Sequence, residues 1–181
     1  MVVGVVGFAA ALVMHARGLR FNVSPSLPIG VYGVVKGPIT RGATVLVCLP
    51  RAGADMARIR GYLWRGSCPG EVAPVGKIVV AVAGDVVAVS AIGVSVNASR
   101  LPHSAPLAVD RRGRPLPAVR GQWVLQRGEL WLYADGDRRS FDSRYFGVVD
   151  TANVRAVMRP LVVLQRSLLG MARDDRPDLV R

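Results

Sequence analysis

Two residues of this chain have types and surroundings that could do hydrolytic chemistry together. Ser26 lies in the stretch NVSPSLPIGVY (22–32), where Pro25 and Pro28 restrict the backbone on both sides of it. Lys77 opens KIVVAVAGD, a run of β-branched and small apolar residues in which burial would lower the pKa of its amine. A neutral amine near about pH 7–8 can take the proton of a serine hydroxyl, so the pair predicts a nucleophile and its base.

Acyl transfer by such a pair needs two further groups. One is a donor for the developing oxyanion, and Ser24 could aim its hydroxyl toward the same place as the Ser26 backbone N–H. The other is a partner that orients the lysine without restoring its charge, for which Ser140 in DRRSFDSRYFG is the candidate. An alternative interpretation leaves Lys77 at the end of a strand with its amine in water and no catalytic role.

Other catalytic centres find little support in the sequence. His15 lies at the edge of the apolar N-terminus and His103 in a proline-rich loop, so neither is well placed for a Ser-His-Asp triad. No G-x-S-x-G, Walker A or H-E-x-x-H motif occurs. Cys48 and Cys68 stand far apart without a C-x-x-C motif or paired histidines, which argues against a metal site. We expect no cofactor, and a Cys48–Cys68 disulfide rather than two free thiols if the domain lies outside the cytoplasm.

Composition places the chain among folded proteins of one domain. It has 181 residues, 51% of them hydrophobic, and its frequent Val, Ala, Gly and Pro favour short strands joined by turns. The net charge of +12 comes almost wholly from arginine, since Lys36 and Lys77 are the two lysines. A basic surface could serve nucleic acid or anionic lipid, and a GC-rich genome that favours arginine codons would produce the same composition.

The order of the predicted elements indicates a mainly β domain. Strands are predicted over 31–36, 43–48, three runs within 77–97, a hairpin over 122–134 that turns at Arg127-Gly128, and last strands over 146–150 and 153–158. A short helix is predicted over 53–64, an excursion loop over 98–121 and a polar loop over 135–147. An amphipathic pattern predicts a helix over 161–173 that packs on the domain or lies on a membrane surface.

The apolar run MVVGVVGFAAALVM (1–14) predicts an N-terminal membrane anchor over 1–16, followed by a single catalytic domain over 17–181. The run is shorter than the ~20 residues of a full span, and its flanking charges lie on its C-terminal side, at His15, Arg17 and Arg20. A buried N-terminal helix is the alternative.

Three segments, in order, resemble the signal peptidase I family. SPSLP (24–28) resembles that family's serine segment, KIVVAVAGD its lysine segment and GDRRSFDSRYFG its last conserved segment. The finer resemblance is to the conjugative-transfer branch, the TraF-type proteases, whose serine segment reads Asn-x-x-x-Ser-(Leu/Ile/Met)-Pro-x-Gly-(Leu/Val)-Tyr. RGYLWRGSCPG and GRPLP are similar to that branch as well. Leu27-Pro28 in place of Met-x-Pro, and Ile78 in place of an arginine, depart from ordinary signal peptidases and fit the TraF-type branch.

The resemblance implies a role for each matching residue. Ser26 would be the nucleophile and Lys77 the general base, with Ser24 as the side-chain donor of the oxyanion hole. Ser140 would orient the lysine, and Asp142 and Arg144 would hold the polar loop in place. The fold implied is the antiparallel β-sheet domain of signal peptidases with an N-terminal anchor helix.

The function implied is a membrane-anchored Ser-Lys endopeptidase on the outer, periplasmic face of the cytoplasmic membrane. It would mature a pilin-like or signal-peptide-bearing precursor for conjugative type IV secretion, with hydrolysis and cyclisation both open. We expect no nucleic-acid partner. The rival is a membrane-tethered, non-catalytic β-domain whose arginines, such as Arg111, Arg112 and Arg114, bind DNA or anionic lipid. Few aromatic residues alternate with those arginines, which weakens the nucleic-acid interpretation.

Overall fold

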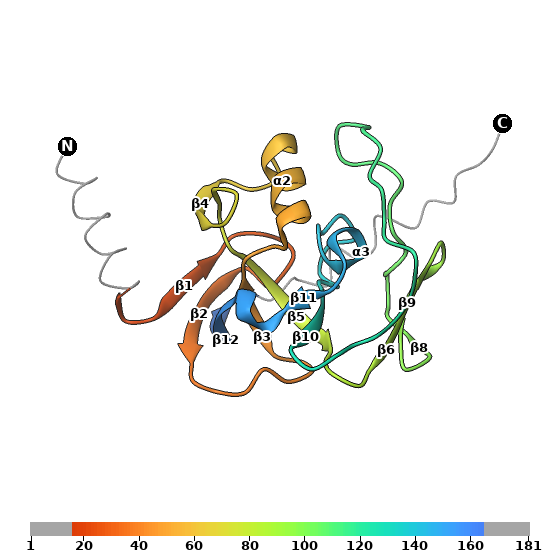
Figure 1. Ribbon diagram of the computed structural model, residues 1–181. Helices are drawn as coiled ribbons and strands as arrows, with labels where there is room; N and C mark the ends of the chain where they lie inside the picture. Colours follow the sequence, from red (N-terminus) through yellow and green to blue (C-terminus); the bar gives the residue numbers. More distant parts are fainter. Residues whose placement is uncertain (1–15, 165–181) are drawn as a thin grey trace.

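Antiparallel strands are the main regular structure of residues 16–164, the part of the chain that the computed structural model describes. The larger sheet has the order β1-β2-β12-β3-β5-β10-β11 (Figure 1). Its strands are β1 (Leu19–Asn22), β2 (Gly30–Val35), β3 (Thr44–Val47), β5 (Val75–Ala81), β10 (Glu129–Tyr133), β11 (Val149–Asp150) and β12 (Val154–Val163). All neighbouring pairs run antiparallel, which confirms the mainly β fold.

A smaller sheet extends from one end of the larger one, at the right of Figure 1. It has the order β8-β7-β6-β9, with β6 (Val86–Ser90), β7 (Gly93–Val96), β8 (Ser99–Arg100) and β9 (Gly121–Val124). The predicted hairpin over 122–134 is therefore wrong, because β9 pairs with β6 while β10 pairs with β5 and β11. The cause is packing between the sheets: Trp123 of β9 packs at a tilt against the buried Trp131 of β10, with ring centroids 5.2 Å apart.

Alternation along β5 decides what faces the interior. Lys77, Val79 and Ala81 are buried, whereas the residues between them are only partly covered. Val79 packs in the core with Val45, Leu132 and other apolar residues of the large sheet. A strand that buries Val79 and Ala81 must turn Lys77 to the same face, so the sheet itself takes this amine out of water.

Two short helices lie against each other, with Gly53 of one packed on Phe146 of the other. Helix α2 (Arg51–Arg60) replaces the helix predicted over 53–64, because Gly61 at φ 67° ends it early and Tyr62 onward leaves the helix axis. Helix α3 (Ser143–Phe146) lies inside the segment predicted as a polar loop, whose residues 142–145 are buried. The remaining elements are β4 (Arg65–Cys68) and the 3-10 turn η1 (Thr151–Asn153).

Three further sequence predictions concern the loop over 98–121 and the two ends of the chain. Residues 101–120 run outside the strands, apart from a single bridge between Val109 and Pro115. The helix predicted over 161–173 is wrong at its start, because residues 161–163 continue β12 beside β2; the rest of it lies outside the described residues. The predicted anchor over 1–16, with His15, also falls almost wholly outside them. Within residues 16–164, no helix is long and apolar enough to cross a membrane.

Cys48 and Cys68 form a disulfide inside an apolar cluster that includes Leu49, Ala54 and Val72. Cys48 directly follows β3, and Cys68 ends β4. The bond therefore ties the excursion that carries α2 and β4 back to the large sheet.

We expect the Cys48→Ser/Cys68→Ser variant to lose about 3 kcal/mol of unfolding free energy, since the disulfide closes a loop with a sequence separation of 20 residues. Urea denaturation followed by circular dichroism measures the loss. Wild-type protein in strong reductant should approach the variant's midpoint. Equal midpoints for the oxidised wild type and the variant would contradict a stabilising role for the bond.

Candidate active site

The loop between β1 and β2 holds Ser26 through a side chain at its start. The Asn22 amide donates to the carbonyl oxygens of Ser24, Leu27 and Pro28, at 2.9, 3.0 and 3.1 Å. The Tyr32 hydroxyl donates to the Pro28 carbonyl at 2.8 Å. These bonds satisfy backbone oxygens that the two prolines leave outside any ladder, so the loop has one defined conformation.

Packing against two glycines, Gly76 and Gly136, also fixes the conformation of this loop. Leu27 is 3% exposed and meets Gly76 of β5, where a Cβ would come within 2.7 Å of its Cδ1. Gly136 lies against the loop backbone, and a Cβ there would meet the Pro25 carbonyl oxygen at 2.8 Å. Both glycines are therefore needed for close approach, one by a side chain and one by the backbone.

Lys77 is 4% exposed and directly follows Gly76, the residue of β5 that packs against Leu27 of this loop. Desolvation lowers the pKa of its amine to about 8, while the nearby Asp142 acts in the opposite direction. About a tenth of the amine is thus neutral at pH 7, and about half of it at pH 8. The alternative interpretation, in which the amine reaches water, is wrong because the strand register turns it inward.

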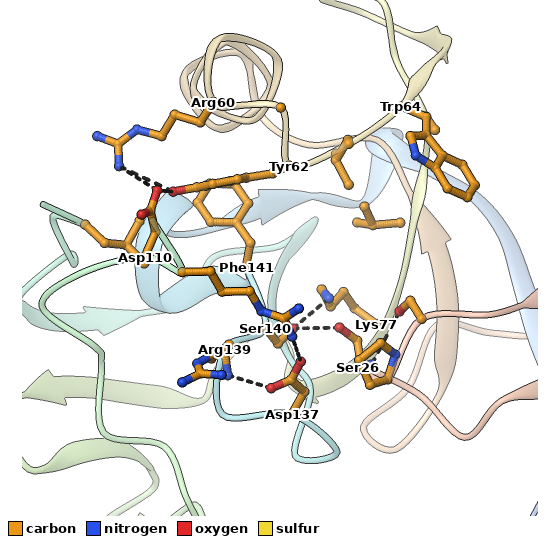
Figure 2. A pocket seen from close by; sticks show the side chains of 18 of the residues that line it. Ser26, Arg60, Tyr62, Trp64, Lys77, Asp110, Asp137, Arg139, Ser140 and Phe141 are labelled. Atoms are coloured by element: carbon orange, nitrogen blue, oxygen red, sulfur yellow. Dashed lines mark hydrogen bonds and ion pairs between the residues drawn. The ribbon is translucent and has the colours of Figure 1, made fainter. Parts of the chain in front are cut away.

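Ser140 joins the lysine to the serine. Its Oγ accepts a hydrogen bond from Lys77 Nζ at 2.8 Å and lies 3.1 Å from Ser26 Oγ, and Figure 2 shows both contacts meeting at this hydroxyl. Within residues 16–164 no direct hydrogen bond joins Lys77 to Ser26, so the contact between amine and nucleophile passes through Ser140. Three polar groups far apart in the sequence therefore form one hydrogen-bonded chain.

A buried ion pair positions Ser140. Asp142 and Arg144 are each 0% exposed in their side chains and pair in a bidentate way, with Nε–Oδ1 2.8 Å and Nη2–Oδ2 2.9 Å. Arg144 also donates to the Ser140 carbonyl oxygen at 3.0 Å, and its guanidinium lies over the rings of Tyr133 and Tyr145. Asp142 caps α3 by accepting from the Arg144 backbone N–H. The pair thus fixes the backbone that carries the bridging hydroxyl.

Ser24 lies beside the nucleophile, but in a different relation from the one expected. The Ser26 backbone N–H donates to Ser24 Oγ at 3.3 Å, instead of pointing with that hydroxyl toward a shared third atom. The Ser24 proton itself remains available for donation. A substrate oxygen that accepts from both groups would replace this long internal bond.

The hydroxyl of Ser26 opens into a cleft of about 670 Å³. One wall is apolar and includes Leu63, Trp64 and Val75. The opposite side carries charged residues of the 98–121 loop and of the segment before Ser140. The sequence did not indicate that Tyr62 and Trp64 line the cleft, because both were expected inside a helix. His103 does not line the cleft.

The site residues that sequence reasoning missed are those that hold others. Asn22 could have been found, since an asparagine ahead of a proline-containing turn is a common partner for turn backbone. Leu27 and Gly136 gave no local signal, because their contacts are with β5 and with the serine loop. No group of three or more His, Cys, Asp or Glu side chains that could hold a metal ion occurs among residues 16–164.

Comparison with known proteins gives a consistent set of relatives. Residues 1–162 match the family model "Signal peptidase, peptidase S26". A plasmid transfer protein TraF of Escherichia coli is 38% identical over 164 residues, covering 90% of this chain and 92% of the relative. A probable conjugal transfer protein TraF of Sinorhizobium fredii is 39% identical over 140 residues, 76% and 73% of the two chains. A signal peptidase I of Enterococcus faecalis has 20% identity and a TM-score of 0.40 over 69% of this chain and 99% of its own, too distant to inform the fold.

We expect Lys77→Met to stabilise the protein at pH 7, because it removes a buried amine whose charged form is disfavoured. The pKa is about 8 in the folded chain and about 10.4 when exposed, so the cost to the wild type, roughly 3 kcal/mol, is fully present below pH 8. It declines as pH rises through 8 to 10.4, where the unfolded chain holds more protons.

Urea unfolding of both proteins between about pH 6 and 10.5 tests this. The variant's advantage should shrink steadily above pH 8. Lys36→Met, which removes an exposed lysine, is the matched control. An advantage that stays constant across the range would mean that Lys77 titrates as it does in water.

Proposed function

The chain belongs to the signal peptidase family, peptidase S26, and within it we propose a Ser-Lys endopeptidase that matures a pilin-like or signal-peptide-bearing precursor for conjugative transfer. The observation that carries the proposal is the contact chain from the buried Lys77 amine through Ser140 to the Ser26 hydroxyl. The relatives named for plasmid and conjugal transfer support the process that it serves.

The first half of the reaction forms an acyl-enzyme. Ser26 Oγ attacks the substrate carbonyl carbon while its proton passes to Ser140, whose own proton moves to the neutral Lys77 amine. The carbonyl oxygen gains negative charge and accepts from the Ser24 hydroxyl and the Ser26 N–H. The C–N bond then breaks, and the Lys77 ammonium returns a proton through the same path to the leaving amine.

The second half decides the product. Water that attacks the acyl-enzyme, with Lys77 again as base, releases a shortened chain and regenerates Ser26. The precursor's own amino terminus, attacking in the same position, would close the chain into a ring. Both outcomes use the same groups of the enzyme, so cyclisation depends on which nucleophile the cleft admits.

We place the catalytic domain on the periplasmic side of the cytoplasmic membrane, held by the N-terminal segment. The Cys48–Cys68 disulfide supports this side, since structural disulfides persist in oxidising compartments and are rare in the cytosol.

Ser26→Ala and Lys77→Met should each abolish maturation of a co-expressed pilin precursor while the variants remain folded. Intact mass of the precursor distinguishes uncut, shortened and cyclised chains. Ser67→Ala and Lys36→Met, which change exposed residues outside the cleft, are the matched controls and should process normally. Full processing by either cleft variant would refute the Ser-Lys mechanism.

The rate of precursor cleavage should rise with pH and level off above about pH 8–9, because the base is the neutral form of an amine whose pKa is about 8. Initial rates measured at several pH values at saturating precursor give the profile. A rate that is flat from about pH 6 to 10 would exclude an amine as the base.

A further inference from the structure

The charges around the cleft do not balance. Of the described residues that line it, five are arginines and two are aspartates; the arginines are Arg60, Arg111, Arg112, Arg114 and Arg139. Three positive charges therefore remain even when Lys77 is neutral. A cleft lined by an excess of positive charge attracts negatively charged groups and raises their local concentration.

The two aspartates are already committed to neighbouring groups. Asp110 Oδ2 accepts from the Tyr62 hydroxyl and pairs with Arg114, both at 2.7 Å, while Arg60 lies 3.8 Å away. Asp137 accepts from the Arg139 backbone N–H at 2.9 Å, and its carboxylate lies 3.5 Å from Arg111. Figure 2 shows the two aspartates on one side of the cleft, with Trp64 on the other.

Two arginines are left with free guanidinium groups. No ion pair within 4.0 Å joins Arg112 or Arg139 to a carboxylate in the described part of the chain, and both are exposed. Their backbones are nonetheless fixed: Asp110 accepts from the Arg112 N–H at 2.8 Å, and Arg139 directly precedes Ser140. Two arginines without an ion pair among the described residues therefore line the cleft that also holds the nucleophile.

We propose that Arg112 and Arg139 form a subsite for a carboxylate of the substrate, close to the bond that is cut. This rests on the proposed function and specifies its substrate class: a segment with small or apolar residues against the Trp64 wall and a negative charge against the opposite side. The carboxylate comes from an acidic side chain or from a nearby free C-terminus. Guanidinium groups suit either source, since they bind a carboxylate in a bidentate way.

The experiment uses a randomised library of short peptides, half of them amidated at the C-terminus, with cut products identified by mass spectrometry. Wild-type protein should cut peptides enriched about fivefold in Asp or Glu, or in free C-termini, within a few positions of the cleavage site. Enrichment that survives amidation identifies the side-chain source, and enrichment lost on amidation identifies the terminal one. The preference should fade at about 1 M salt, where screening acts within ~3 Å.

The variant Arg112→Gln/Arg139→Gln should lose this preference and still cut neutral peptides. Arg120→Gln/Arg138→Gln is its matched control, because it removes the same charge from exposed positions that do not line the cleft. The proposal would be overturned if the peptides cleaved by the wild-type protein had the same charge composition as the whole library. It would also be overturned if Arg112→Gln/Arg139→Gln kept the wild-type preference.

Failure of the proposed function gives a different result. An acylating penem probe reports Ser26 reactivity without needing a peptide. No labelling and no cleavage would refute the peptidase itself, whereas labelling without any cut peptide would refute only this peptide subsite. Binding of DNA or anionic vesicles that depends on Arg112 and Arg139, with no change in peptide preference, would assign the two arginines to those ligands instead.

Discussion

The hydrogen bond from Lys77 to Ser140 is the interaction on which the rest of the site depends. It occurs because strand alternation turns a lysine to the face that buries Val79 and Ala81, where its amine finds one hydroxyl at 2.8 Å. Burial lowers the pKa of that amine to about 8, and the hydroxyl gives the neutral amine a hydrogen-bonding partner that carries no negative charge. If the same position faced a carboxylate directly, the lysine would be held in its charged form and could not serve as a base.

The surrounding structure keeps that hydroxyl in place from two directions. The Asp142–Arg144 pair holds the Ser140 backbone, and breaking such a buried pair by removing one partner typically costs 3–5 kcal/mol. Asn22 and Leu27 hold the serine loop over it. The nucleophile and the hydroxyl that it touches therefore come from different segments, each fixed by its own buried contacts.

The sequence was sufficient for the parts of this site that have local signals. The run of β-branched and small apolar residues in KIVVAVAGD predicted a strand, and the prolines around Ser26 predicted a rigid loop; both elements are present. It could not decide whether Lys77 is buried, because that depends on which face of β5 meets the core. It also misplaced β9 and the end of α2, where contact between Trp123 and Trp131 and the turn at Gly61 override the local pattern. The cationic side of the cleft was unpredictable for the same reason: Arg112 and Arg139 lie far apart in the chain, and only the fold brings both to the lining of one cleft.

The central claim is that the Lys77 amine is neutral enough near physiological pH to act as a base. It can be measured directly, since Lys36 and Lys77 are the two lysines of the chain and Lys36→Met leaves one signal to follow. An NMR titration of that variant, labelled with ¹³C at the lysine Cε, should give a midpoint of about 8. A midpoint at about 10.4, the ordinary value for lysine, would contradict the account.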